Sequence, residues 1–455
     1  MTFSEQPDHN LAREIGLRDG IAIVAGTMIG SGIFLVPSAI AAFVPSLAMV
    51  LLVWTFGALV SLAAALVLSE LGAMFPAAGG LYVYLREAFG PLTAFLYGWA
   101  SIVAIDSGAT AAVSTAFGIY LGQFFQLSAT QVKLAAIAVI AVLTVVNCLG
   151  VKFGKSIQNV FATCKLAGIG VMAVLLFSRA NVGQMRESLW PAGAHTSLTG
   201  FGIAVVAALW AYYGWHETSY NAAEFRNPQR DLPKALVFGT MIVSATYLLA
   251  NIAYYAVLTP LQVAQSPRVA ATALAAIFGA SAASVLAAMI MVSTFGAANG
   301  MILSGPRIPY VMGREGVFIH AAGRVNARTR TPILAIIIQG VWASLLCCVG
   351  TFSQLIQYAV FTICFFFVLA ALGVMKVRRT QRDLHRPFRT PLYPWLPIVT
   401  ILANGGLLVN TLAADPKHSL YGIGMVALGV PLYYLFRSGR PAVRGQQEQG
   451  IAARG

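Results

Sequence analysis

The chain has 455 residues, of which 58% are hydrophobic and only 10% are charged, whereas soluble domains carry about 25% charged residues. This composition excludes a water-soluble globular protein and predicts one integral membrane domain. The formal net charge of +14 arises from short basic clusters between apolar runs, which are typical of membrane topology signals and not of a nucleic-acid-binding face. We therefore expect a lipid bilayer around the protein and no nucleic acid partner.

The N-terminal segment and the cysteines limit what else the chain contains. Residues 1–19 are polar and mixed in charge, and no cleavage pattern follows them, so we interpret them as a cytoplasmic segment and not as a signal peptide. The five cysteines lie inside apolar stretches, without metal-ligand spacing and without a neighbouring histidine cluster. We expect no disulfide framework and no metal site from them, and no motif indicates another cofactor.

Twelve apolar segments are long enough to cross a membrane as helices, for which about 20 residues are needed. Glycine and alanine, which allow helices to approach closely in lipid, are frequent in them. We predict an all-α transmembrane domain over residues 20–436, followed by a cytoplasmic tail over 437–455. The predicted spans cover residues 20–45, 48–75, 91–121, 132–150, 158–178, 200–223, 235–258, 271–301, 332–350, 354–375, 395–413 and 419–436.

The basic residues divide unequally between the two sides of these spans. Of the 29 Lys and Arg residues, 23 lie in segments on the side of the N-terminus, 5 lie on the other side, and Lys165 lies within a span. Because Lys and Arg concentrate in cytoplasmic loops, both termini are expected in the cytoplasm. The protein is predicted to be a multi-pass protein of the cell (inner) membrane.

The first span contains a group of small residues near its middle. It reads IAIVAGTMIGSGIFLVPSAI and includes Gly26, Gly30, Ser31 and Gly32. Each glycine costs up to about 1 kcal/mol relative to alanine inside a helix, and unwound backbone at membrane depth is tolerated only where it lines a cavity or is buried in protein. We predict that this helix is interrupted; the alternative is a glycine face for helix packing.

The sixth span has a similar interruption. Residues 212–214, with Gly214 last, are followed at once by the polar residues 216–218. Two interrupted helices five spans apart are typical of transporters built from two inverted five-helix repeats. The repeats are predicted over residues 20–178 and 200–375, with two extra helices over 395–436.

Interrupted helices also predict the kind of substrate. The amino end of a half-helix carries a partial positive charge that suits a carboxylate, and the carbonyl groups at the other end suit an ammonium group. An amino acid offers both groups.

The motifs of both interruptions resemble those of the amino acid-polyamine-organocation permeases, and most closely the L-type amino acid transporter branch. They are GTMIGSGIF in the first span and AYYGWHE, followed by AEFRNPQRDLPKAL, in and after the sixth. Further similar segments, in the family's order, are SELGAMFPAAGGLYVYLREAFG, TFGAANGMILSGPRIPYVMGREG and RPFRTPLYPWLP. The resemblance implies a twelve-helix fold of two inverted repeats and alternating-access transport of amino acids without an obligatory sodium ion.

The resemblance also implies a substrate site. The α-carboxylate of the substrate would meet the backbone amides of residues 30–32. Its α-amino group would meet carbonyl groups near Met28, and near Trp210 and Ala211. Trp210 stands where the family has a large aromatic residue that closes over the substrate; the alternative is a packing or lipid-facing residue.

Two neighbouring positions depart from the family pattern. Tyr213 stands where many relatives have glycine or aspartate. His216 stands where relatives often have asparagine or aspartate. The resemblance therefore leaves the side-chain specificity of the substrate open.

Lys165 is the foremost charge inside a span. It lies about eight residues, or roughly 12 Å, from the cytoplasmic end of its helix, and a buried charge costs about 2.5–3.5 kcal/mol on insertion scales. The alternative is that it extends to the inner surface. In sodium-independent relatives a lysine here replaces a sodium ion, so the ammonium group is expected near the carbonyl of Gly26 and the hydroxyl of Ser293 or Thr294.

Asp106 and Glu217 are the other charges predicted at membrane depth. Asp106 lies about fifteen residues into the third span, near the midplane. It is interpreted as a proton site, a contact for a substrate cation or a partner of another polar group. Glu217 is expected to pair with His216 or with Lys165. Glu70 and Glu224 are interpreted as interfacial partners of basic residues.

These observations favour a secondary transporter of L-amino acids, most simply neutral ones, that works by exchange or by proton coupling. The alternative is a carrier of cationic amino acids or polyamines, for which Asp106 and Glu217 supply counter-charges. A membrane enzyme or channel is less favoured, because no catalytic or filter motif is present. The outer segment LGQFFQLSATQ lacks the cysteine that animal L-type light chains use, so no disulfide-linked heavy chain is expected.

Overall fold

The computed structural model describes residues 11–438 except residue 267, residues 350–351 and residue 415. In this part of the chain the secondary structure is helical, with one isolated bridge between Ile15 and Phe225 and no strand. The first half contains α1 (Leu17–Met28), α2 (Gly32–Ala41), α3 (Leu47–Met74), α4 (Leu81–Phe89), α5 (Pro91–Ala100), the π-helical segment η1 (Ser101–Ile105), α6 (Asp106–Phe125), α7 (Ala129–Cys148), α8 (Val151–Phe177) and α9 (Val182–Leu189).

The second half begins with another helix that is followed directly by a segment of different geometry. Its elements are α10 (Leu198–Ala211), the 3-10 segment η2 (Trp215–Glu224), α11 (Pro228–Val257), α12 (Pro260–Gln265), α13 (Val269–Phe278), η3 (Gly279–Ser281), α14 (Ala282–Ser304), α15 (Arg307–Arg314), η4 (His320–Gly323), α16 (Ile333–Val349), α17 (Phe352–Thr380), α18 (Trp395–Ala414) and α19 (Pro416–Ser438).

The helices are long and apolar enough to cross a membrane. Ten helical segments of the described chain meet this test, and α1 with α2, whose axes are bent by 48°, adds an eleventh if the pair is one span. A further apolar helix, α16, has only 17 residues. The chain is a multi-pass membrane protein, and the prediction of an all-α membrane fold is confirmed.

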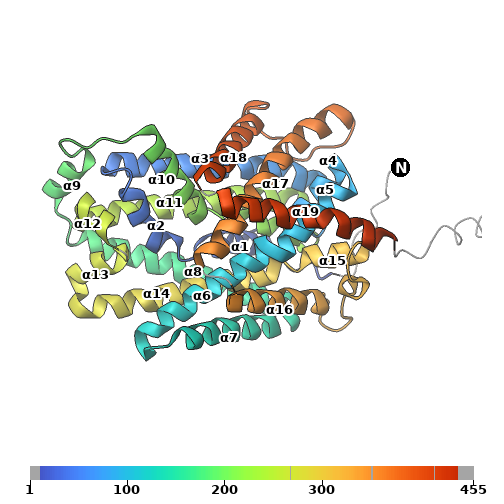
Figure 1. Cartoon of the computed structure of the whole chain (residues 1–455), viewed down its shortest axis with the longest axis horizontal. Helices are drawn as coiled ribbons and strands as arrows, with labels where there is room; N and C mark the ends of the chain where they lie inside the picture. The colour runs from blue at the N-terminus through green and yellow to red at the C-terminus, as the bar shows by residue number, and fades with distance from the viewer. Residues whose placement is uncertain (1–10, 267, 350–351, 415, 439–455) are drawn as a thin grey trace, which may run out of the picture.

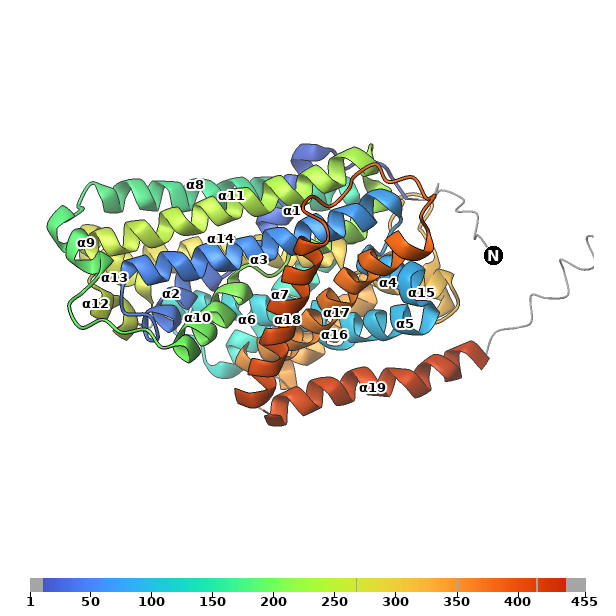
Figure 2. The same cartoon turned by 90° about the horizontal axis from the view of Figure 1, so that it is seen from above.

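The long helices α3, α8, α11 and α14 run along the long axis of the molecule (Figure 1). The short helices α9, α12 and α13 lie at one end, whereas α4, α5 and α15 lie at the opposite end (Figure 2). α1 packs against α8, α11 and α14. The interruption between α1 and α2 is therefore enclosed by other helices.

The eighth predicted span, residues 271–301, is divided in the structure. α13 ends at Phe278, and Gly279 follows with a φ of +55°, in the left-handed region that glycine adopts at little steric cost. One 3-10 turn then leads into α14, which begins at Ala282. The prediction of one continuous helix was wrong here, because the apolar composition continues across the turn.

Two buried ion pairs join distant segments of the chain. Glu70 accepts hydrogen bonds from Nε and Nη2 of Arg378 at 2.8 and 2.6 Å. Glu224 accepts from Nε and Nη2 of Arg307 at 2.6 and 3.0 Å. The expectation of basic partners is confirmed, and both carboxylates are buried within the protein. These two-point contacts hold α3 to α17 and η2 to α15.

Candidate functional site

The first span is interrupted at residues 29–31. α1 ends at Met28, and α2 begins at Gly32. The side chain of Ser31, the N-cap residue of α2, makes no capping hydrogen bond, so it leaves the first amides of α2 uncapped. A side chain at Gly30 would meet no atom within 4 Å. Open space and the amino end of a helix therefore lie together, which suits a bound carboxylate.

The second interruption follows α10, which ends at Ala211. Gly214 has a φ of +112°, a conformation that residues with a side chain rarely adopt. Its carbonyl oxygen accepts a hydrogen bond from the Thr27 hydroxyl at 3.1 Å. A side chain at Gly214 would come within 3.0 Å of the Thr27 backbone. The two interruptions are thus in direct contact, although 187 residues separate Thr27 from Gly214.

One tyrosine joins the carbonyl ends of the two half-helices. The hydroxyl of Tyr247, on α11, lies 2.9 Å from the carbonyl oxygen of Met28 and 2.9 Å from that of Ala211. Two carbonyl groups that share one donor must point to the same place. Two of the three carbonyl groups expected to meet the substrate ammonium, those of Met28 and Ala211, therefore converge at Tyr247. The third, of Trp210, accepts from the amide of Tyr213 at 3.0 Å.

Gly32 differs from Gly30 in what surrounds it. A side chain at Gly32 would come within 3.0 Å of Cα and Cβ of Ala211, so this glycine allows α2 to pack against α10. Of residues 30–32, which were expected to receive the substrate carboxylate, Gly30 therefore faces open space and Gly32 faces protein.

Trp210 and Tyr213 are stacked on one another at the end of α10. Their ring centroids are 5.7 Å apart, and the ring planes differ by 20°. Tyr213 also contacts the ring of His216, at 5.2 Å. The aromatic residue expected to close over the substrate is therefore in contact with the residue that departs from the family pattern.

Lys165 is buried and bound to the first interruption. Its ammonium group donates to the carbonyl of Gly26 at 2.6 Å and to that of Ile29 at 2.8 Å. The Ser293 hydroxyl, on α14, donates to Ile29 at 2.9 Å and also reaches the next carbonyl. Thr294 instead donates to carbonyl groups of its own helix. Lysine, serine and unwound backbone thus join α8, α1 and α14, and Thr294 takes no part.

Asp106, His216 and Glu217 form a second buried group. One oxygen or nitrogen of each lies within 4.8 Å of those of the others. The expected pairing of Glu217 with His216 or Lys165 is not made: neither Glu217 oxygen and neither His216 nitrogen has a hydrogen-bond partner in the described part of the chain. Lys165 is instead bound to the carbonyl groups of the first interruption.

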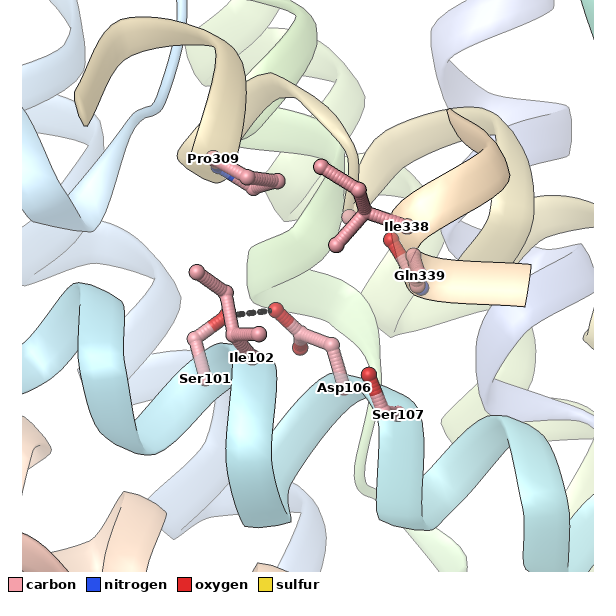
Figure 3. Close-up of a pocket in the computed structure, with 8 residues that line it drawn as sticks. Ser101, Ile102, Asp106, Ser107, Pro309, Ile338 and Gln339 are labelled. Carbon is pink, nitrogen blue, oxygen red and sulfur yellow. Dashed lines mark hydrogen bonds between the residues drawn. The ribbon is translucent and has the colours of Figure 1, made fainter. Parts of the chain in front are cut away.

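Asp106 directly follows the π-helical segment η1. Its Oδ2 accepts a hydrogen bond from the Ser101 hydroxyl, whereas its Oδ1 has no partner among the described residues. Figure 3 shows the Asp106 carboxylate turned towards Ser101, beside a small cavity that Pro309 and Gln339 also line. π-Helical segments often occur at functional sites.

Comparison with known proteins identifies the family. The sequence profile of the amino acid permease family matches residues 15–429. The chain belongs to this family. It is 34% identical to the b(0,+)-type amino acid transporter 1 of Mus musculus, over 94% of this chain and 88% of that protein. It is 31% identical to the serine/threonine exchanger SteT of Bacillus subtilis, over 94% and 97%, and 30% identical to the human cystine/glutamate transporter, over 94% and 85%.

The family assignment confirms the resemblance that the motifs indicated. Each of these relatives is named as a transporter or an exchanger. An enzymatic role for this permease therefore has no support from its relatives.

Three residues of the permease site were missed in the sequence. Tyr247 and Tyr254 lie seven residues apart on one face of α11, and Tyr254 also donates to the first broken helix, at Ile33. Paired tyrosines at this spacing in an apolar span were the available signal. Gln158 of α8 was also missed: a side chain at Gly26 would come within 1.8 Å of its amide nitrogen, so the absence of a side chain at Gly26 leaves room for Gln158 against α1.

Proposed function

We propose that this permease is a secondary transporter of L-amino acids that works by alternating access. The single observation that carries the proposal is the position of the Tyr247 hydroxyl, 2.9 Å from the carbonyl oxygens of both Met28 and Ala211. It supports an ammonium site made from the carbonyl ends of two half-helices. The open space at Gly30, beside the amino end of α2, supports a carboxylate site next to it.

The proposed membrane arrangement has twelve spans in two inverted repeats. The ten long spans, the bent pair α1 and α2, and the shorter α16 supply that number. The first repeat runs from α1 to α8 and the second from α10 to α17, with α18 and α19 outside both. The interrupted helices α1–α2 and α10–η2 are then the first helices of their repeats. In transporters with inverted repeats, the interrupted first helices of the two repeats meet near the middle of the membrane, and the direct contact between these two helices agrees with that arrangement.

The proposed orientation places both termini in the cytoplasm of a cell membrane. α15, which contains two arginines, and the end of α19, which carries a further arginine, lie at one end of the molecule (Figure 2). α9, which contains Arg186, one of the five arginines and lysines assigned to the outer side, lies at the opposite end (Figure 2). This separation supports the orientation that the basic residues predicted.

The proposed transport does not depend on sodium, because Lys165 supplies a fixed cation. Its ammonium group lies at two carbonyl oxygens of the first interruption, a place where a metal cation would also find oxygen ligands. The mechanism is exchange or proton coupling, and no disulfide-linked heavy chain takes part. The segment between α6 and α7 contains no cysteine.

Uptake by the purified protein in liposomes tests the proposal. Radiolabelled neutral L-amino acids are supplied in sodium or choline buffer, with and without an amino acid inside. We expect equal uptake in both buffers and competition only by compounds that keep both the α-amino and the α-carboxyl group. Uptake that needs internal amino acid indicates exchange. Stronger competition by amines without a carboxylate, or a strict need for sodium, contradicts the proposal.

A further inference from the structure

We infer that Asp106, His216 and Glu217 form a binding site for one divalent transition-metal ion, such as Mn²⁺ or Zn²⁺. The inference goes beyond amino acid transport and does not rest on it. All three side chains are at least 98% buried. Their ligand atoms lie within 4.8 Å of one another, and they come from two elements that are distant in sequence, α6 and η2.

The first argument is that the polar atoms of this site are unsatisfied. Asp106 Oδ1, both nitrogens of His216 and both carboxylate oxygens of Glu217 have no hydrogen-bond partner in the described part of the chain. No ion pair with a described Lys or Arg neutralises either carboxylate. Burying one unpaired charge costs several kcal/mol, so two carboxylates at one place must be neutralised, either by protons or by a bound cation.

The second argument is the chemistry of the donor set. Two carboxylates and one imidazole are ligands that first-row divalent ions accept together, whereas Mg²⁺ and Ca²⁺ prefer oxygen alone. A proton or a substrate ammonium group is satisfied by the carboxylates and leaves the imidazole unused. Metal–ligand distances of about 2.0–2.2 Å place neighbouring ligand atoms about 3–4 Å apart. The present separation of up to 4.8 Å is about 1 Å wider than this spacing, so the carboxylates would have to move towards the imidazole when an ion binds.

The third argument is that the surroundings hold the ligands in place. The ring of His216 contacts the rings of Tyr213, Trp215, Tyr220 and Phe367, with centroids 5.1–5.8 Å apart. These contacts restrict its rotation. The second oxygen of Asp106 is held by the Ser101 hydroxyl. Groups that orient the ligands in this way raise the affinity of metal sites by about 10- to 100-fold.

A fourth observation concerns the remaining coordination positions. The cavity beside Asp106 has a volume of about 10 Å³, close to the smallest space that holds one water molecule. Figure 3 shows this space between Ser101, Pro309 and Gln339. A water molecule there would lie beside the Asp106 carboxylate, although neither His216 nor Glu217 lines this cavity.

The site is tested by metal binding to the whole purified protein after treatment with a chelator. Titration calorimetry with Mn²⁺ or Zn²⁺ is expected to show one ion per chain, together with a rise in the unfolding temperature. Asp106→Asn, His216→Gln and Glu217→Gln are each expected to weaken binding about tenfold or more. The exposed residues Asp383 and His195 supply matched controls, Asp383→Asn and His195→Gln, which should bind as the wild type does.

Three results would overturn the inference. The first is the absence of saturable binding at ion concentrations up to about 1 mM. The three side chains would then bind a proton or a substrate ammonium group instead of a metal ion. The second is equal binding by the wild type and all three site variants, which places the ion elsewhere. The third is equal affinity for Ca²⁺ and Mn²⁺, which is inconsistent with an imidazole ligand. Because three separate variants are tested, the experiment remains decisive if one of them does not fold. None of the measurements depends on transport activity.

Discussion

The ammonium group of Lys165 lies 2.6 Å from the carbonyl oxygen of Gly26, so α8 is joined to α1 just before α1 is interrupted. The contact needs the helix to end nearby, because the carbonyl groups of a regular helix are occupied by its own amides. A change in the angle between α1 and α2 would therefore alter the contacts of the Lys165 ammonium group. This residue is well placed to link the interruption to the scaffold.

The first prediction follows from this contact. A hydrogen bond to a charged group contributes about 1.5–3 kcal/mol, and Lys165 makes two. We expect Lys165→Ala to lower uptake into liposomes about tenfold or more, with normal insertion into the membrane. Lys165→Arg is expected to retain part of the activity if the guanidinium group fits between α1 and α14.

The matched control for this substitution is on the same helix. Lys152 has a side chain that is 73% exposed, so Lys152→Ala should leave uptake close to that of the wild type. Full activity of Lys165→Ala would show that the fixed charge is not needed, whatever the buffer cation.

The second prediction concerns the space beside Gly30. Because a methyl group there meets no atom within 4 Å, Gly30→Ala is expected to fold and even to gain up to about 1 kcal/mol of stability from the unfolded chain. The same methyl group intrudes on the proposed carboxylate site. We expect about tenfold weaker substrate binding, measured as substrate-induced thermal stabilisation.

A glycine outside the site controls for the effect of the methyl group itself. Gly170 on α8 also has no atom within 4 Å of an added side chain, and Gly170→Ala should bind substrate normally. Gly32 is not suitable for this test, because a larger residue there meets Ala211. Unchanged affinity in Gly30→Ala would place the carboxylate elsewhere.

Much of the fold could be predicted because long apolar runs and glycine groups act locally. The interruption at residues 29–31 was predicted from the sequence around Gly30, where the helix propensity is low over several successive residues. The division between α13 and α14 was missed, since a single Gly279 in an apolar run does not distinguish a turn from a packing position. Composition reveals spans better than it reveals the turns inside them.

The site was predicted less completely, because its contacts join residues far apart in sequence. Lys165 was recognised as unusual from its own span, and its carbonyl partners lie 136 and 139 residues away. The hydroxyl of Ser293 or Thr294 was expected beside it; Ser293 lies there, whereas Thr294 bonds to its own helix. The grouping of Asp106, His216 and Glu217 was not predicted. Spacing in the sequence reveals ligands only within one segment, and Asp106 lies on a different helix from the other two residues.

The third prediction concerns stability. Arg307 and Glu224 form a two-point ion pair with side chains that are 1% and 0% exposed. Removing one partner of a buried pair leaves an unpaired charge and costs about 3–5 kcal/mol. Arg307→Ala is therefore expected to lower the unfolding temperature of the detergent-purified protein clearly. Arg179→Ala, at an exposed position, should leave the unfolding temperature unchanged, and equal temperatures for the two variants would argue against a stabilising role for the pair.

The last prediction concerns Tyr247, whose hydroxyl donates to the carbonyl groups of Met28 and Ala211. Tyr247→Phe keeps the ring and removes the shared donor, at a cost of about 1 kcal/mol. Without that donor the two carbonyl groups are free to turn apart, and the ammonium site that they form is less well defined. We expect a several-fold rise in KM for uptake and a smaller change in kcat.

The same helix supplies the control for this test. Tyr255 is also buried on α11, but its hydroxyl has no hydrogen-bond partner in the part of the chain that the structure describes. Tyr255→Phe therefore removes a hydroxyl without removing a contact, and its KM should equal that of the wild type. If Tyr247→Phe also kept the wild-type KM, the carbonyl groups of Met28 and Ala211 would hold their positions without the tyrosine, and its role would be limited to packing. If both variants raised KM equally, the effect would belong to the face of α11 and not to the shared hydrogen bond.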